Sequence, residues 1–236
     1  MIIEKERTYI DINLKYEGRK AIISERDPKD RIFKTIAQSK QFYERILLNY
    51  LYHLAMPDWV FIDIGAHIGN HSVFFGSILG LQGYSFEANT ETYQTLQHNI
   101  RQNGLEGSVA YFNRAIGHKQ GRGSLIKSTK AHNSGMCRFQ NTSTGDIEMT
   151  TIDALHLPKL DLLKIDVEGY ELNCLLGAKS TLIRTKPLIV IEIIETENFL
   201  EIKDWLRPYG YQPMRRYNST PTYIFSTQPR SFYEYS

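Results

Sequence analysis

The chain has 236 residues, 42% of them hydrophobic and 23% charged, and its net charge is +2. A chain of this length buries roughly 70–75% of its unfolded surface, which is enough for one α/β core of ordinary size. The near-neutral charge favours neither a nucleic-acid nor an anionic-membrane partner, and no apolar run is long enough to span a bilayer.

Two cysteines are too few for a disulfide framework. The charged residues that open the chain are not followed by the apolar run of a secretory signal. We therefore expect a reducing compartment and a cytoplasmic location.

The first 58 residues differ in pattern from the rest and are expected to form a small N-terminal extension. Alternation over 9–14 predicts a strand, and a second strand is expected over 20–24. Apolar residues at helical spacing predict a helix over 41–54, which Pro57 ends.

Residues 59–236 are expected to form the main domain, because strand and helix patterns alternate along them. The predicted strands span 60–64, 83–87, 109–113, 160–166 and 188–193. The predicted helices begin near residues 70 and 90, span 168–185, and end near Gly210. Two late strands, over 212–217 and 222–226, are expected to form an antiparallel hairpin. The pattern predicts a doubly wound, mostly parallel sheet that binds its ligands at the carboxyl ends of the strands.

The interval 117–145 is rich in Gly, Ser and Asn and too long for a plain connection. We expect it to hold short strands or a mobile lid.

The stretch 61–70 combines an apolar strand, an acid, a glycine turn and the start of a helix. Such a turn places backbone N–H groups around a small polar ligand. The carboxylate of Asp63 would repel a pyrophosphate and attract a cation, and only Gly65 and Gly69 of a three-glycine dinucleotide fingerprint are present. The turn therefore favours S-adenosylmethionine (SAM), which carries a sulfonium and an ammonium.

Glu87 ends the next strand, near the offset of about 20 residues at which an acid meets a ribose diol. Asn113, Ala115 and Ile116 end the third strand and are candidates for an adenine slot, although an ordinary strand end fits them equally well.

A second acidic pattern follows the strand that ends at Asp166. An acid after a buried apolar run is costly, so a role at the mouth of the pocket is favoured for Asp166. Glu168 starts the next helix, where it either acts in the site or complements the helix dipole.

These motifs together resemble the FkbM family of SAM-dependent methyltransferases. The resemblance covers 60–193 and rests on 61–69, the pair Phe86-Glu87 with Asn99 downstream, 151–155, 162–178 and 191–193. It implies a class I methyltransferase (Rossmann-like) fold, SAM as the methyl donor, and O-methylation of a hydroxyl on a sugar, glycan or other small natural product. His67 stands where the family often has Asn.

The turn, the strand ends and the resemblance together give a predicted set of donor-binding residues: Asp63, Gly65, Ala66, His67, Gly69, Asn70, His71, Glu87, Ala88, Asn113, Ala115, Ile116 and Asp166. The candidates for the general base are Asp166, Glu168 and His132, in that order, and Asn133 beside His132 is a candidate for orienting a sugar.

Some alternatives stay open at this point. His71 can be structural, and Tyr43-Glu44 can lean over the donor site. A divalent metal held by Asp166, Glu168 and Glu192 is possible in principle, although no ligand spacing demands one.

Two other functions compete with methyl transfer. A nicotinamide-dependent oxidoreductase explains Glu87 but neither Asp63 nor the missing glycine. A non-catalytic SAM-binding protein would keep the same motifs. The sequence leaves the acceptor and the oligomeric state open.

Overall fold

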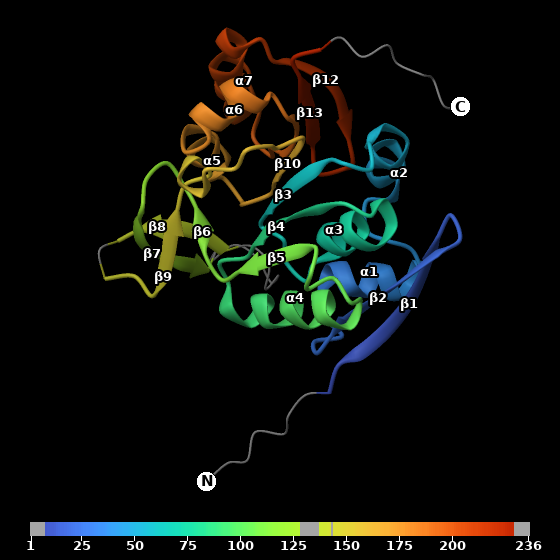
Figure 1. Cartoon of the computed structure of the whole chain (residues 1–236). Helices are drawn as coiled ribbons and strands as arrows, with labels where there is room; N and C mark the ends of the chain where they lie inside the picture. Colours follow the sequence, from blue (N-terminus) through green and yellow to red (C-terminus); the bar gives the residue numbers. More distant parts are fainter. Residues whose placement is uncertain (1–7, 128–136, 143, 229–236) are drawn as a thin grey trace.

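A seven-stranded sheet forms the centre of the protein, whose computed structural model describes residues 8–127, 137–142 and 144–228 (Figure 1). The strand order is β12-β13-β11-β10-β3-β4-β5. The parallel strands are β3 (Val60–Ile64), β4 (Gln82–Phe86), β5 (Val109–Phe112), β10 (Leu162–Ile165) and β11 (Leu188–Glu192). The hairpin of β12 (Gln212–Tyr217) and β13 (Thr222–Ser226) adds to β11 in the antiparallel direction. The predicted α/β class, the mostly parallel sheet and the C-terminal hairpin are confirmed.

Alternate residues of the central strands enter two separate hydrophobic cores, one on each face of the sheet. Phe61 and Leu162 belong to the first core, whereas their neighbours Ile62 and Leu163 belong to the second. The first core is covered by α3 (Asn70–Val73), its π-helical continuation Phe74–Leu79, and α4 (Thr90–Gln102). The second is covered by α5 (Glu171–Leu176), α6 (Lys179–Thr185) and α7 (Thr196–Leu206), which a 3₁₀ turn, Arg207–Tyr209, follows. The sheet is therefore doubly wound.

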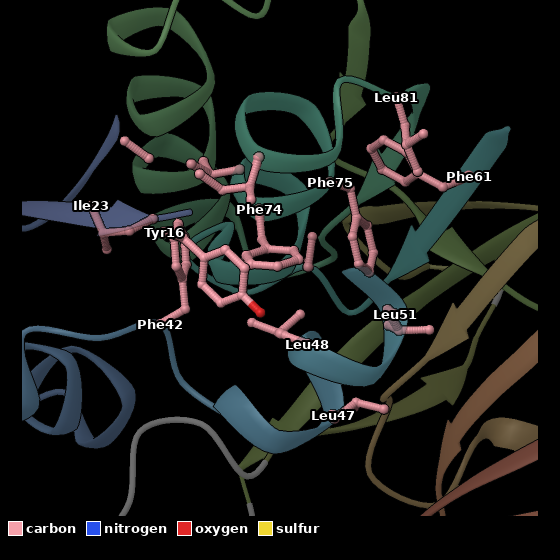
Figure 2. Packing of buried hydrophobic residues seen from close by; sticks show 14 of the residues in the cluster. Tyr16, Ile23, Phe42, Leu47, Leu48, Leu51, Phe61, Phe74, Phe75 and Leu81 are labelled. Carbon is pink, nitrogen blue, oxygen red and sulfur yellow. The ribbon is translucent and has the colours of Figure 1, made fainter. Parts of the chain in front are cut away.

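The N-terminal segment packs into the first core. It consists of the antiparallel hairpin β1 (Ile10–Tyr16) and β2 (Arg19–Glu25), then α1 (Arg31–Ser39) and α2 (Arg45–Leu54). Figure 2 shows Tyr16 and Phe42 beside Phe74, and their ring centroids lie 5.0 and 5.1 Å from that of Phe74. Residues 8–58 and the central sheet thus share one core.

Asparagines of α4 bind the backbone of β2. The Asn103 side chain bonds to both backbone groups of Ile22, and the Asn99 side chain to both of Ser24. Asn99 also donates to the carbonyl of Ile68, in the turn after β3. One buried side chain therefore ties the N-terminal hairpin, α4 and the glycine turn together.

A second, four-stranded sheet has the order β6-β9-β7-β8. It consists of β6 (Ala115–Ile116), β7 (Gly121–Lys127), β8 (Cys137–Asn141) and β9 (Ile147–Thr150), and a 3₁₀ turn, Asp153–Leu155, follows. The long interval predicted from sequence thus contains short strands. His132, Asn133 and Ser134 lie outside the described residues.

The helix predicted over 168–185 is divided into α5 and α6. A Cβ atom at Gly177 would lie 1.9 Å from the carbonyl oxygen of Gly117, so only glycine fits where this loop passes. Within the described part of the chain, every helix is too short or too polar to traverse a bilayer.

Candidate active site

A cavity of about 400 Å³ opens at the carboxyl ends of β3, β4, β10 and β11. Residues that follow these strands form its floor, and they include Gly65, Glu87 and Asp166. Ala88, Ala115, Ile116 and Leu125 line one side. The N-terminal segment supplies the roof, which consists of Asp27, Lys29, Asp30, Arg31, Ile32 and Tyr43.

Glu87 presents its carboxylate to the cavity. The backbone N–H of His67 donates to Oε2 (2.8 Å) and that of Asn89 to Oε1 (2.8 Å), which fixes the plane of the carboxylate. Burial raises the pKa of Glu87, and these two hydrogen bonds and the nearby His67 oppose the rise. Each oxygen keeps a second lone pair, so the group can still accept from a ligand diol.

The turn after β3 is held in a conformation that favours glycine. Gly65 has φ +73°, and a Cβ atom there would lie 1.8 Å from the carbonyl oxygen of Asp166. His67 also adopts a positive φ of 50°, and its Nε2 lies 3.3 Å from Oδ2 of Asp30. Its Nδ1 is buried and finds no hydrogen-bond partner among the described residues. His67 itself lines the cavity.

Asp166 and Glu192 form a carboxylate pair at the other end of the cavity floor. Both line the cavity, and a side-chain hydrogen bond joins them. Burial, together with the charge of Asp166, raises the pKa of Glu192 to about 9. Burial also opposes ionisation of Asp166, but Lys164 and the bond from Glu192 outweigh it and lower its pKa. At neutral pH the pair therefore holds one proton, on Glu192, beside an ionised Asp166.

Asp63 differs from its predicted place in the pocket. Its side chain is fully buried, accepts from the Ser72 hydroxyl (2.7 Å), and lies 3.1 Å from Nζ of Lys164. It does not line the cavity, and its charge is balanced by Lys164 within the protein. Asp63 therefore lies outside the cavity lining, where it pairs with Lys164.

Five other predicted donor-binding residues also lie behind the wall of the cavity: Ala66, Gly69, Asn70, His71 and Asn113. Asn70 exchanges two hydrogen bonds with the backbone of Tyr43, and His71 Nε2 lies 3.0 Å from Oε2 of Glu44. Asn113 donates to the carbonyls of Glu87 and Ala88. These three side chains shape the site without facing it.

The structure brings together the other predicted residues that it describes. Gly65, His67, Glu87, Ala88, Ala115, Ile116, Asp166 and Glu168 all line the cavity. His132, the third candidate for the general base, lies outside the described residues. Tyr43 lines the roof, as its suggested position over the site requires.

Sequence reasoning missed most of the roof, residues 27–32. A local signal was present, because Asp30 is a good N-cap and Phe33 and Ile36 are spaced as in a helix. That signal predicts the helix α1, but it does not predict that α1 packs over the cavity at the carboxyl ends of the strands.

The family model for the methyltransferase FkbM domain matches residues 63–213. The chain belongs to the FkbM methyltransferase family. The resemblance seen in the sequence is therefore confirmed, and the matched region holds the floor of the cavity but not its roof.

A curated relative is the hexuronic acid methyltransferase AglP of Haloferax volcanii, which is 27% identical over 154 residues. The match covers 64% of this chain and 62% of the relative, so the chain spans less than two thirds of that protein's length.

Two solved structures have a similar fold. The methyltransferase FkbM from Methylobacillus flagellatus has a TM-score of 0.56 at 18% identity, over 72% of this chain and 44% of that one. P. horikoshii TYW2, solved in complex with MeSAdo, has a TM-score of 0.50 at 15% identity, over 95% of this chain and 72% of that one. At these identities the likeness shows the class I methyltransferase fold alone.

The sequence left open a divalent metal held by Asp166, Glu168 and Glu192. Among residues 8–127, 137–142 and 144–228, no three His, Cys, Asp or Glu side chains are grouped so as to hold a metal ion.

Proposed function

We propose that this protein is a SAM-dependent O-methyltransferase whose acceptor is a hydroxyl of a sugar, glycan or other small natural product. The observation that carries the proposal is the Glu87 carboxylate, fixed at the end of β4 and facing a cavity whose other end holds the Asp166–Glu192 pair. Membership of the FkbM family supports methyl transfer, and the relative named for a hexuronic acid supports a sugar acceptor.

The residues of the cavity fit an adenosyl donor. Glu87 offers two acceptor oxygens for a ribose diol, and Ala88 and Ala115 leave room for a flat ring on the adjacent wall. SAM, when bound, supplies an electrophilic methyl group on a sulfonium.

Asp166 is the best-placed proton acceptor. It stays ionised because Nζ of Lys164 lies 3.5 Å from its Oδ2 and because Glu192 donates to it. An acceptor hydroxyl hydrogen-bonded to Asp166 would be oriented in the cavity and lose its proton there as the oxygen reacts. A positioned general base typically contributes about 10²–10⁴-fold. Glu168 lines the same wall and is the second candidate.

The proposal is tested by calorimetry with S-adenosylhomocysteine and, as a competing ligand, NADH. We expect the protein to bind S-adenosylhomocysteine in preference to NADH. Glu87→Gln should weaken that binding by about tenfold or more, because a hydrogen bond to a charged group contributes about 1.5–3 kcal/mol. Glu201→Gln, on the exposed side of α7, is the matched control and should bind as the wild type does.

Preference for NADH, or equal affinities for S-adenosylhomocysteine in the Glu87→Gln and Glu201→Gln variants, would contradict the assignment. Asp166→Asn should lose methyl transfer from radiolabelled SAM to a panel of glycans and alcohols.

A further inference from the structure

Arg31 occupies a fixed position in the roof of the cavity, outside the region that the family model matches. It is the first residue of α1, directly after the capping residue Asp30. The Asp30 carboxylate accepts from the backbone N–H of Phe33 (2.8 Å) and lies 3.3 Å from Nε2 of His67. The start of α1 is therefore attached to the turn that forms the cavity floor.

The charge of Arg31 is not matched by an ion pair anywhere in the part of the chain that the structure describes. The nearest acids on its own segment already have partners. Asp30 is engaged as above, and Oδ1 of Asp27 accepts from the backbone N–H of Lys29 (2.9 Å). Arg114, the other arginine that lines the cavity, lies 3.0 Å from Glu148. An exposed guanidinium in a cavity roof is thus available to a ligand.

Tyr43 lines the roof of the cavity together with Arg31. The residue is half-buried, and its backbone is held by Asn70. Burial and the charge of Glu44 raise the pKa of its phenol, Arg31 opposes the rise, and Glu192 and Asp166 add to it. Arg31 and the carboxylate pair therefore both act on the phenol of Tyr43, and all of these residues line the same cavity.

We propose that Arg31 binds the carboxylate of a ligand in the cavity. The planar guanidinium fork matches the two oxygens of a carboxylate, and such pairs give both orientation and affinity. The inference rests on the proposed function, and two ligands of that function can carry the carboxylate. One is the amino-acid end of the donor, and the other is a sugar-acid acceptor.

The donor arm of the test compares two ligands by calorimetry. S-adenosylhomocysteine has the amino-acid end, whereas 5′-methylthioadenosine lacks it. If Arg31 binds the donor, Arg31→Gln lowers the affinity for S-adenosylhomocysteine by about tenfold or more and leaves the affinity for 5′-methylthioadenosine unchanged. Arg31→Lys keeps the charge but loses the planar fork, so its affinity for S-adenosylhomocysteine should lie between those of the wild type and Arg31→Gln. Lys34→Gln, on the same helix but away from the cavity, is the control.

The acceptor arm titrates the protein loaded with S-adenosylhomocysteine, using ligand-observed NMR and D-glucuronate or D-glucose as probes. If Arg31 binds the acceptor, glucuronate binds more tightly than glucose by about tenfold, and Arg31→Gln removes the difference without changing the affinity for S-adenosylhomocysteine.

Arg31→Gln affinities equal to those of Lys34→Gln for both S-adenosylhomocysteine and glucuronate would overturn the inference while leaving the proposed function intact. An equal loss of affinity for S-adenosylhomocysteine and 5′-methylthioadenosine in Arg31→Gln would also overturn the inference. Arg31 would then support the structure of the site and not bind a carboxylate. Failure of the wild type to bind either adenosyl ligand would instead remove the proposed function, and the inference with it.

Discussion

At the scale of single residues, Lys164 governs the buried charges beneath the site. Its Nζ lies 3.1 Å from Asp63 and 3.5 Å from Asp166, and these two carboxylates raise its pKa although burial acts to lower it. One cation thus neutralises a buried structural acid and keeps the candidate base ionised. Breaking a buried pair on one side typically costs about 3–5 kcal/mol, so Asp63 and Lys164 depend on each other.

Glu192 gives the molecule a pH dependence that can be measured. Its pKa is about 9 in the folded protein, against an ordinary value of 4.5. Between these two values the folded state binds more protons than the unfolded state, so the free energy of unfolding falls as the pH rises from about 4.5 to about 9. Glu192→Gln keeps a neutral donor for Asp166 and removes this slope.

We therefore expect the melting temperature of the wild type to fall by about 10 °C more than that of Glu192→Gln between pH 5 and pH 9, since the pKa difference corresponds to several kcal/mol and each 1 kcal/mol shifts the melting temperature by roughly 2–4 °C in a domain of this size. Calorimetric melting curves at several pH values, with Glu201→Gln as the control, measure the difference. If the melting temperatures of the wild type and Glu192→Gln changed equally with pH, Glu192 would be ionised at neutral pH.

The sequence predicts which residues line the cavity well where they follow a strand and less well where they lie inside one. Glu87 and Asp166 each come directly after a buried parallel strand, and both face the cavity. Asp63 lies within β3, where side chains alternate between the two faces, and its register partner in the neighbouring strand is Lys164. That pairing joins residues about a hundred positions apart, and no local pattern contains it.

At the scale of elements, Asp30 joins α1, which belongs to the roof of the cavity, to the glycine turn after β3. Asp30 both caps α1 and pairs with His67. Burial alone would lower the pKa of His67, but Asp30 raises it, and His67 in turn lowers the pKa of Asp30 against the effect of burial.

Asp30→Asn separates the two roles of this residue, because asparagine caps a helix as well as aspartate does but carries no charge. The raised pKa of His67 contributes stability that is fully present below its unfolded value of 6.5 and is lost as the pH rises through the folded value. We expect Asp30→Asn to destabilise the protein at pH 6, with the loss fading by pH 9.

An NMR titration of His67 checks this expectation directly, since Asp30→Asn should lower its pKa. Asp30→Ala is the comparison. It also removes the helix cap, so it should lower the free energy of unfolding by about 1 kcal/mol more than Asp30→Asn at every pH. An unchanged His67 titration in Asp30→Asn would mean that the pair carries no charge interaction.

The order of strands and helices could be read from the sequence, whereas interruptions within helices could not. The strands of the main sheet and the terminal hairpin lie where periodicity places them. The break at Gly177 arises because the backbone of Gly117 passes against it, and the helix after Asn70 continues in π-helical form through Phe74–Leu79. Interruptions of this kind depend on tertiary packing, which the hydrophobic periodicity of a single segment does not report.

At the scale of the whole molecule, the N-terminal segment is part of the main core. Ile23, Phe33 and Leu48 from this segment are fully or almost fully buried in the same cluster as Phe61 and Phe74. Removing the segment would expose the apolar face of α3 and the π-helical turn, and apolar area contributes about 25 cal/mol per Å².

We expect a chain of residues 59–236 to lose cooperative unfolding. Circular dichroism melting and binding of a hydrophobic dye measure this directly. The full chain should show one sharp transition and little dye binding, whereas the truncated chain should show a broad transition and strong binding. A sharp transition at the temperature of the full chain would demonstrate instead that residues 59–236 fold alone.

The shared core also has a consequence for recombining members of this family. A chimera that exchanged only residues 63–213 with another member would transplant Glu87, Asp166 and Glu192 while keeping the host's own Arg31 and Tyr43. The carboxylates of the cavity floor would then travel with the graft, whereas any contribution of Arg31 and Tyr43 to ligand binding would stay with the recipient.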